Sequence, residues 1–200
     1  MKKKILYFLL LVSLLFFLLT IYPSIIFADN NDFVPAKWAN PQGLRMQWFK
    51  SADDYFSSIM SGNFSKWNGI DSNICIIKYY YNSNNSDLGY EIRVIGAKLK
   101  NSTMATTAMY KKLLGVDVSV NFWSYTGVIS KMVIAMDTRG DGLLSKSPSQ
   151  KTKTFLHEVG HTLCLDHPNC GSTAIMQQGF SSPAALTIQT HDKNNLKAKW

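Results

Sequence analysis

The sequence is poor in histidine, in clustered charge and in repeated segments. Only four of its 200 residues are histidines, and none precedes His157. The formal net charge is +8, but the basic residues are scattered, whereas nucleic-acid binding requires a clustered basic patch. No internal repeat is evident. These absences argue against a nucleic-acid-binding protein, and the length suits one domain with a sizeable core.

Cysteine is scarce as well, with Cys75, Cys164 and Cys170 as its only occurrences. An odd number cannot form a complete disulfide framework. Cys164 and Cys170 are close enough in sequence to form one local bridge. The alternative is that the thiols are free and buried, above all Cys75, which lies in an apolar segment.

The N-terminal residues resemble an export signal more than part of a folded domain. Three lysines at positions 2–4 precede a nearly unbroken apolar run over 5–21, and Ala28 precedes a polar stretch. This order predicts a signal peptide over residues 1–28 and a secreted, extracellular product. The alternative is an uncleaved membrane anchor, because the apolar run is almost long enough to span a bilayer.

Residues 29–43 form a short polar segment before the domain predicted at 44–200. This segment is too short to fold as an inhibitory pro-domain. It also lacks cysteine, so no thiolate from it can block a metal site. We therefore expect no thiol-latched precursor.

Hydrophobic periodicity predicts an α+β domain. A helix is expected over 53–67, with Ser51 as its N-cap, and a last helix is expected from Thr190, with Asp192 in its first turn. A third helix should begin at Ser147-Pro148 or Ser149 and bury an apolar face. His191 is expected at the surface. Strands are predicted over 44–49, 74–81, 90–99, 116–125 and 131–136, while 101–114 suits a loop or a short helix.

The stretch 137–142 alternates aspartate and glycine, which is a weak indication of calcium binding. It lacks the closing glutamate of the twelve-residue calcium loop. A solvated turn is the favoured interpretation.

The residues with clearest chemistry are 157–167, with the sequence His-Glu-Val-Gly-His-Thr-Leu-Cys-Leu-Asp-His. On a helix, His157 and His161 project from one face and can hold one zinc ion. Glu158 is placed to act as a general base toward a zinc-activated water. His167 can complete a three-histidine site if the helix ends before it. The alternative is a helix that carries two hydrogen-bonded histidines without a metal.

The choice of third ligand follows from another absence. No glutamate follows Glu158, which excludes the zinc enzymes that use a downstream glutamate. Asp166 is one residue short of the position that His167 holds and would point differently. His167 is therefore the predicted third ligand, and Cys164 is not expected to bind the metal.

This pattern resembles the HExxHxxGxxH signature of the metzincin zinc metalloproteases, with Cys164 in place of the glycine. Residues 174–176, which end at Met176, resemble the Met-turn of that family. The similarity is greatest to the matrixin-like branch of bacterial secreted proteases. The branches with a metal-approaching tyrosine two residues after the methionine are disfavoured, because Gln178 stands there.

The resemblance implies a twisted mixed sheet of about five strands, an active-site helix and a C-terminal helix. It implies a monomeric zinc endopeptidase in which His157, His161 and His167 bind one zinc, Glu158 is the general base and Met176 forms the floor. A protein or peptide substrate would lie along an edge strand near 131–136. Since no histidine precedes His157, no second, structural zinc is expected. The glycine-to-cysteine change leaves open an exported, non-catalytic zinc-binding module as the alternative.

Overall fold

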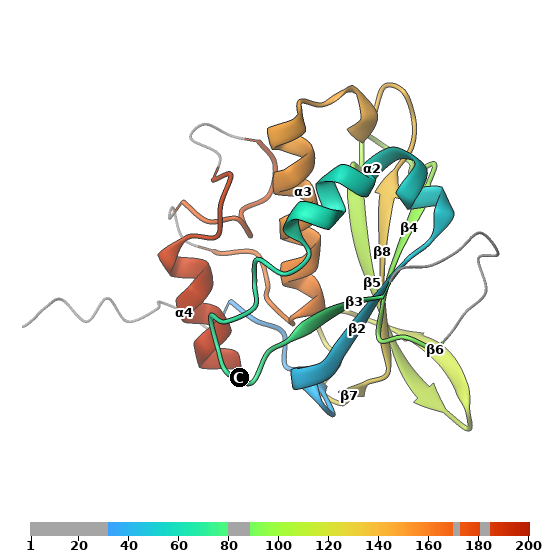
Figure 1. Cartoon of the computed structure of the whole chain (residues 1–200). Coiled ribbons are helices and arrows are strands. Elements are labelled where there is room, and N and C mark those ends of the chain that lie inside the picture. The colour runs from blue at the N-terminus through green and yellow to red at the C-terminus, as the bar shows by residue number, and fades with distance from the viewer. Residues whose placement is uncertain (1–31, 80–88, 170–172, 181–184) are drawn as a thin grey trace, which may run out of the picture.

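The structure is a computed structural model, and it describes residues 32–79, 89–169, 173–180 and 185–200. The predicted signal peptide at 1–28 lies outside these residues. Within them, none of the helices has both the length and the apolar composition needed to cross a membrane. The chain is α+β, with a mixed six-stranded sheet covered on one face by helices (Figure 1).

The main sheet has the strand order β3-β2-β4-β8-β5-β6. Four neighbouring strands run parallel, and β5 and β6 form an antiparallel hairpin at one side. The strands are β2 (Leu44–Trp48), β3 (Ile76–Tyr79), β4 (Ile92–Ala97), β5 (Ala105–Leu113), β6 (Val116–Val120) and β8 (Lys131–Asp137). A separate parallel pair joins β1 (Lys37–Trp38) to β7 (Val128–Ile129).

Two helices pack between the sheet and the C-terminal helix. The helix α2 (Lys50–Asn63) contacts β4, and α3 (Pro148–Thr162) contacts α2, β5 and β8. The helix α4 (Thr190–Lys199) lies beyond α3, on the side away from the sheet (Figure 1). Short 3-10 turns, Pro41–Gly43 and Leu143–Ser145, precede β2 and α3.

The core lies where α2 and α3 meet the sheet. Phe56 and Met60 of α2 are fully buried, as are Phe155 and Leu156 of α3. Trp67 follows α2, is fully buried, and donates a hydrogen bond from Nε1 to the Leu156 carbonyl, 3.1 Å away. Burial of such large apolar side chains is the main force that fixes α3 against the rest of the domain.

Helix α2 differs from its predicted limits. It begins at Lys50 and ends at Asn63, with Phe49 rather than Ser51 at the N-cap. The Ser51 hydroxyl instead accepts a hydrogen bond from the Gly96 backbone N–H, at 3.0 Å. The serine was a plausible cap by residue type, but tertiary contact with β4 determines its role.

The segment 101–114, predicted as a loop or short helix, contains the nine-residue strand β5. Buried and exposed side chains alternate only weakly along this strand, because Met109 is its one buried residue. The strand is held by pairing with β8 and β6, which involves residues distant in sequence. Conversely, the strand predicted over 116–125 ends at Val120, because the Asn121 side chain accepts backbone hydrogen bonds that start a turn.

The strand β8 is central, with β4 on one side and β5 on the other. The expectation that 131–136 forms a substrate-binding edge is therefore wrong. The available edge belongs to β5: β6 pairs with it only at Met109–Leu113, so residues 105–108 pair with β8 alone among the described strands.

Candidate metal centre

Helix α3 begins where the sequence predicts. Ser147 is the N-cap, Gln150 completes a capping box, and Pro148 occupies the first turn. The predicted apolar face is fully buried at Phe155, Leu156 and Val159. With that face fixed in the core, His157 and His161 project together from the opposite side of the helix, as residues four apart must.

The end of α3 turns the chain back toward these two histidines. The Leu165 N–H donates to the Gly160 carbonyl at 3.1 Å, and the Cys164 N–H donates to the His161 carbonyl at 2.9 Å. This pair of bonds is a Schellman motif, whose C′ residue adopts a left-handed conformation. Cys164 has φ +66°, so it takes the conformation that glycine would adopt without steric cost.

The cysteine is buried rather than directed at the site. Its thiol is free and has no exposed surface, and burial raises its pKa to about 12. A thiol in that state is neither nucleophilic nor a good metal ligand. Cys170, the predicted alternative partner in a disulfide, lies outside the described residues.

The turn that carries His167 is braced by the N-terminal segment. Phe33 and Leu165 form an antiparallel bridge, and the Asp166 N–H donates to the Asp32 carbonyl at 2.8 Å. The Asp32 carboxylate, 4% exposed, also contacts His191 Nε2 at 2.8 Å. His191 is thus partly buried and structural, not the surface residue expected from sequence.

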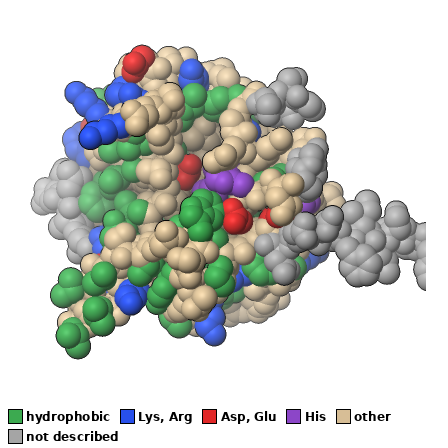
Figure 2. Space-filling model, turned by 180° about the vertical axis from the view of Figure 1, so that it is seen from behind, with side chains coloured by type: hydrophobic (Ala, Val, Ile, Leu, Met, Phe, Trp, Pro, Cys, Tyr) green, Lys and Arg blue, Asp and Glu red, His purple; other side chains and the backbone are tan. Residues whose placement is uncertain are grey.

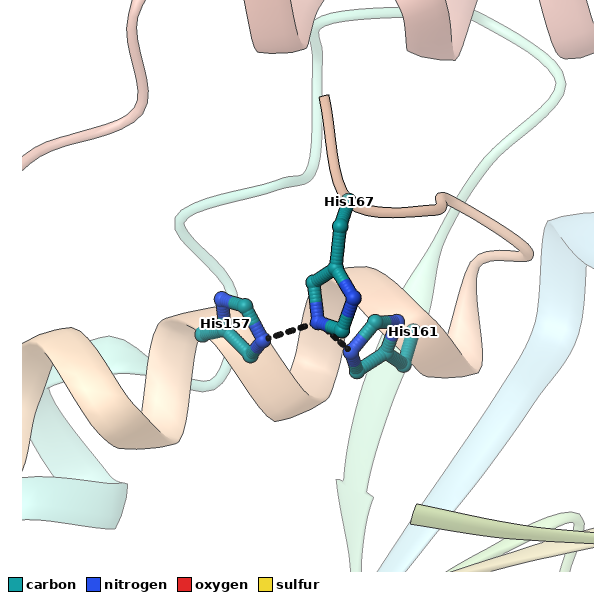
Figure 3. Close-up of side chains that lie close together, drawn as sticks. All are labelled: His157, His161 and His167. Atoms are coloured by element: carbon teal, nitrogen blue, oxygen red, sulfur yellow. Dashed lines mark hydrogen bonds between the residues drawn. The ribbon is translucent and has the colours of Figure 1, made fainter. Parts of the chain in front are cut away.

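The three histidines converge on one point (Figure 3). His167 Nε2 is 3.1 Å from His157 Nε2 and 3.2 Å from His161 Nε2. The ligand nitrogens of all three lie within 4.8 Å of one another, and in the described part of the chain no other group of three His, Cys, Asp or Glu residues could hold a metal.

Backbone carbonyls fix the orientation of two rings. His157 Nδ1 lies 3.0 Å from the Ile175 carbonyl, and His161 Nδ1 lies 2.8 Å from the Leu165 carbonyl. A carbonyl only accepts, so each Nδ1 carries a proton and, in a neutral ring, Nε2 carries a lone pair. Burial lowers the pKa of His157 to about 4 and that of His161 well below 6.5, which keeps both rings neutral. Their lone pairs therefore point toward a common cation position.

Met176 lies beneath the helix. It is 2% exposed, and a Cβ at Gly160 would overlap its sulfur, so only glycine allows this close approach.

The turn around Met176 is held by Asp192 of α4, which is 1% exposed. Its carboxylate accepts hydrogen bonds from the N–H groups of Ile175 and Met176, at 2.9 and 3.2 Å.

Asp192 therefore acts on the site through one intermediary. It fixes the backbone of Ile175, and the Ile175 carbonyl in turn fixes the His157 ring. Residues that hold a metal ligand in place without touching the metal orient that ligand and raise the affinity of the site for the metal. The sequence predicted Asp192 only as a residue of the first helical turn, because nothing local links it to position 175.

Glu158 faces the same space from the adjacent helix position. It is 6% exposed, and the Thr107 hydroxyl of β5 donates to its Oε2 at 2.7 Å. Burial raises the pKa of Glu158 to about 7, although the bond from Thr107 acts in the opposite direction. Such a carboxyl can both accept and release a proton near neutral pH.

These groups line a cavity of about 660 Å³. One wall is the start of β5 and the residues before it, and another is the stretch after Met176, Gln177 to Phe180. Phe122 and Trp123 complete the lining near the histidines. In Figure 2, histidine side chains lie at the centre of this face, with acidic and apolar side chains beside them. Sequence reasoning gave no role to Phe122, Trp123 or Thr107.

One carboxylate of the loop 137–142 has a structural role. Asp137 is fully buried and ion-paired with Arg139 at 2.9 Å, and it accepts a hydrogen bond from the Leu99 N–H at 3.1 Å. Burial alone would raise the pKa of this carboxyl, but the bonds from Arg139 and Leu99 outweigh burial and lower it. The expected solvated turn is wrong for Asp137, whose oxygens are already engaged.

Comparison of the sequence with protein-family models gives no match, and comparison with curated proteins gives none. The interpretation of the site therefore rests on its residues and their geometry.

Proposed function

We propose that the chain is a zinc-dependent endopeptidase of the metzincin type. The observation that carries the proposal is the convergence of His157, His161 and His167 beside a buried carboxylate in an open cavity.

The residues fit a zinc ion. Tetrahedral zinc with Zn–N bonds of about 2.05 Å requires nitrogens about 3.3 Å apart. The separations of 3.1 and 3.2 Å from His167 Nε2 are close to this value. The Nδ1 contacts of His157 and His161 leave a lone pair on Nε2 of each ring, and two lone pairs directed to one place favour a cation there. Three imidazoles leave the fourth position open, as a catalytic site requires.

A zinc ion held there would supply Lewis-acid polarisation of a peptide carbonyl and a lowered pKa for water. Glu158 accepts the proton of the attacking water and delivers it to the leaving amine. The Thr107 hydroxyl donates a hydrogen bond to Oε2 of Glu158 and so holds this carboxylate at the cavity wall.

The open edge of β5 suits an extended peptide. Among the strands that the structure describes, residues 105–108 pair on one side only, and they adjoin the cavity, which Ala105, Thr106 and Thr107 help to line. An added strand would form main-chain hydrogen bonds there, with side chains alternating toward and away from the cavity. The substrate class is therefore an unfolded or extended polypeptide. We also propose that residues 1–28 export the chain.

The experiment is metal-dependent cleavage of casein by the purified chain. Activity should be lost on chelation and restored by one equivalent of zinc. Asp141→Asn, on the exposed loop before α3, serves as a control that retains activity. Stoichiometric zinc binding with no cleavage of casein or of a broad peptide library would contradict the proposal and favour the non-catalytic binding module instead.

A further inference from the structure

An aromatic pair lies against the histidines. The Trp123 ring centroid is 5.5 Å from that of His167 and 6.0 Å from that of His161, and Phe122 lies 5.2 Å from His161. Phe122 is partly buried, but Trp123 is 49% exposed although it lines the cavity. A large apolar ring that is half exposed beside polar groups frequently anchors a ligand.

The tryptophan is held in place. The Asn121 side-chain oxygen accepts hydrogen bonds from the N–H groups of Trp123 and Ser124, at 3.0 and 3.1 Å. The Phe122 ring meets Trp123 edge to face, with centroids 4.7 Å apart. A ring fixed before binding loses little conformational entropy when a ligand covers it.

The two ends of the cavity differ in chemistry. Beyond His157 the lining includes Lys153, whose ammonium donates hydrogen bonds to the carbonyls of Gln177 and Gly179. At the other end, beside His161 and His167, Phe122 and Trp123 present aromatic surface. At the Lys153 end, the ammonium is buried and lies 5.6 Å from the centroid of the Phe180 ring. A polypeptide that crosses the metal position therefore meets Phe180 with the buried Lys153 at one end, and Phe122 with the half-exposed Trp123 at the other.

Strand register assigns the aromatic end a direction. Pairing between β5 and β6 stops at Met109 and Val120, next to the open edge of β5. Trp123 follows Val120 by three residues, in the turn after β6. An added strand antiparallel to β5, the more stable arrangement, has its N-terminal part nearest Met109. The aromatic end thus faces residues on the N-terminal side of the scissile bond.

We propose that Trp123, backed by Phe122, forms a binding subsite for an aromatic or large aliphatic side chain on the N-terminal side of the cleaved bond. This inference rests on the proposed function, since it assumes a polypeptide in the cavity. The physical basis is stacking and apolar burial on a preformed ring face. A different role for the ring is to shield the histidines from water, and the test separates the two.

The first arm maps the bonds cleaved in unfolded casein by the wild type, Trp123→Ala, Trp123→Phe and the control Tyr55→Ala. The wild type should favour aromatic and large aliphatic residues at one position N-terminal to the cut. Trp123→Ala should reduce that preference about tenfold, which corresponds to roughly 1.4 kcal/mol. Trp123→Phe should retain most of it, and Tyr55→Ala, which removes an exposed aromatic ring of α2 outside the cavity lining, should leave it unchanged. An equal loss at all bonds, or weakened zinc binding, would overturn the subsite in favour of shielding.

The second arm does not require catalysis. N-acetyl-phenylalaninamide and N-acetyl-alaninamide are titrated into zinc-loaded Glu158→Gln protein, with binding followed by nuclear magnetic resonance. The phenylalanine probe should bind more tightly, and Trp123→Ala in the same background should remove the difference. If casein is not cleaved but this difference is found, the proposed function fails and the subsite stands. Equal binding of both probes would overturn the subsite.

Discussion

Replacing Asp192 with alanine should weaken zinc binding without touching a ligand. The Asp192 carboxylate accepts from the N–H groups of Ile175, Met176 and Gln189, at 2.9, 3.2 and 2.8 Å. The Ile175 carbonyl, on the same short turn, is the partner of His157 Nδ1. Loss of the carboxylate therefore frees the turn that holds the first histidine.

The size of the effect follows from burial. Asp192 is 1% exposed, and the first two N–H groups it serves are buried. Each buried donor left without a partner costs about 1–3 kcal/mol, so Asp192→Ala should lower the free energy of unfolding by about 3 kcal/mol. Loss of a group that orients a metal ligand typically lowers metal affinity by about 10–100-fold. Asp192→Asn keeps one acceptor oxygen and should fall between alanine and the wild type.

The assay combines urea unfolding of the metal-free protein with competitive zinc titration of the folded protein. Asp54→Ala is the control, because Asp54 is 47% exposed and its ion pair with Lys50 lies at the surface. Its expected cost is below about 1 kcal/mol, with no change in zinc affinity. Wild-type zinc affinity in Asp192→Ala would refute the linkage through Ile175.

Two further predictions concern Asp137 and Cys164. Asp137→Asn should lower the free energy of unfolding near pH 7, because the fully buried carboxylate loses its charge and its ion pair with Arg139. The folded-state pKa of Asp137 is lowered, so the stability difference between the wild type and Asp137→Asn should be complete above the ordinary value of 3.8 and should shrink as pH falls below it. Urea unfolding of both proteins at about pH 7 and about pH 3 measures this. The same stability difference at both pH values would contradict the prediction. At Cys164, with φ +66°, Cys164→Gly should be more stable than Cys164→Ala by about 1 kcal/mol, because both lack the sulfur but only alanine retains the left-handed strain. Thermal unfolding of the two variants measures this difference, and an equal melting temperature would argue against strain at that turn.

The sequence predicted those parts of the site whose residues are close together along the chain. The helix start at Ser147, the shared face of His157 and His161, and the return of His167 all follow from capping, helical spacing and a turn within residues 147–167. Local physical rules are sufficient there, because each step involves neighbours in sequence.

The parts that sequence reasoning missed depend on distant contacts. The strand β5 has weak alternation and is stabilised by two partner strands, so 101–114 gave no clear pattern. Because this segment was not predicted as a strand, the edge of the sheet was expected at residues 131–136, whereas the open edge belongs to β5 and not to β8. Thr107, Trp123 and Asp192 reach the site only through tertiary packing. No spacing rule connects them to the histidine motif.

The central claim is that Glu158 is the general base of a zinc peptidase, and Glu158→Gln tests it most directly. Glutamine keeps the size of the side chain and can still accept the Thr107 hydrogen bond, so zinc should bind as in the wild type. Casein cleavage by the zinc-loaded variant should fall about 10²–10⁴-fold. Full activity in Glu158→Gln with zinc bound would contradict the account.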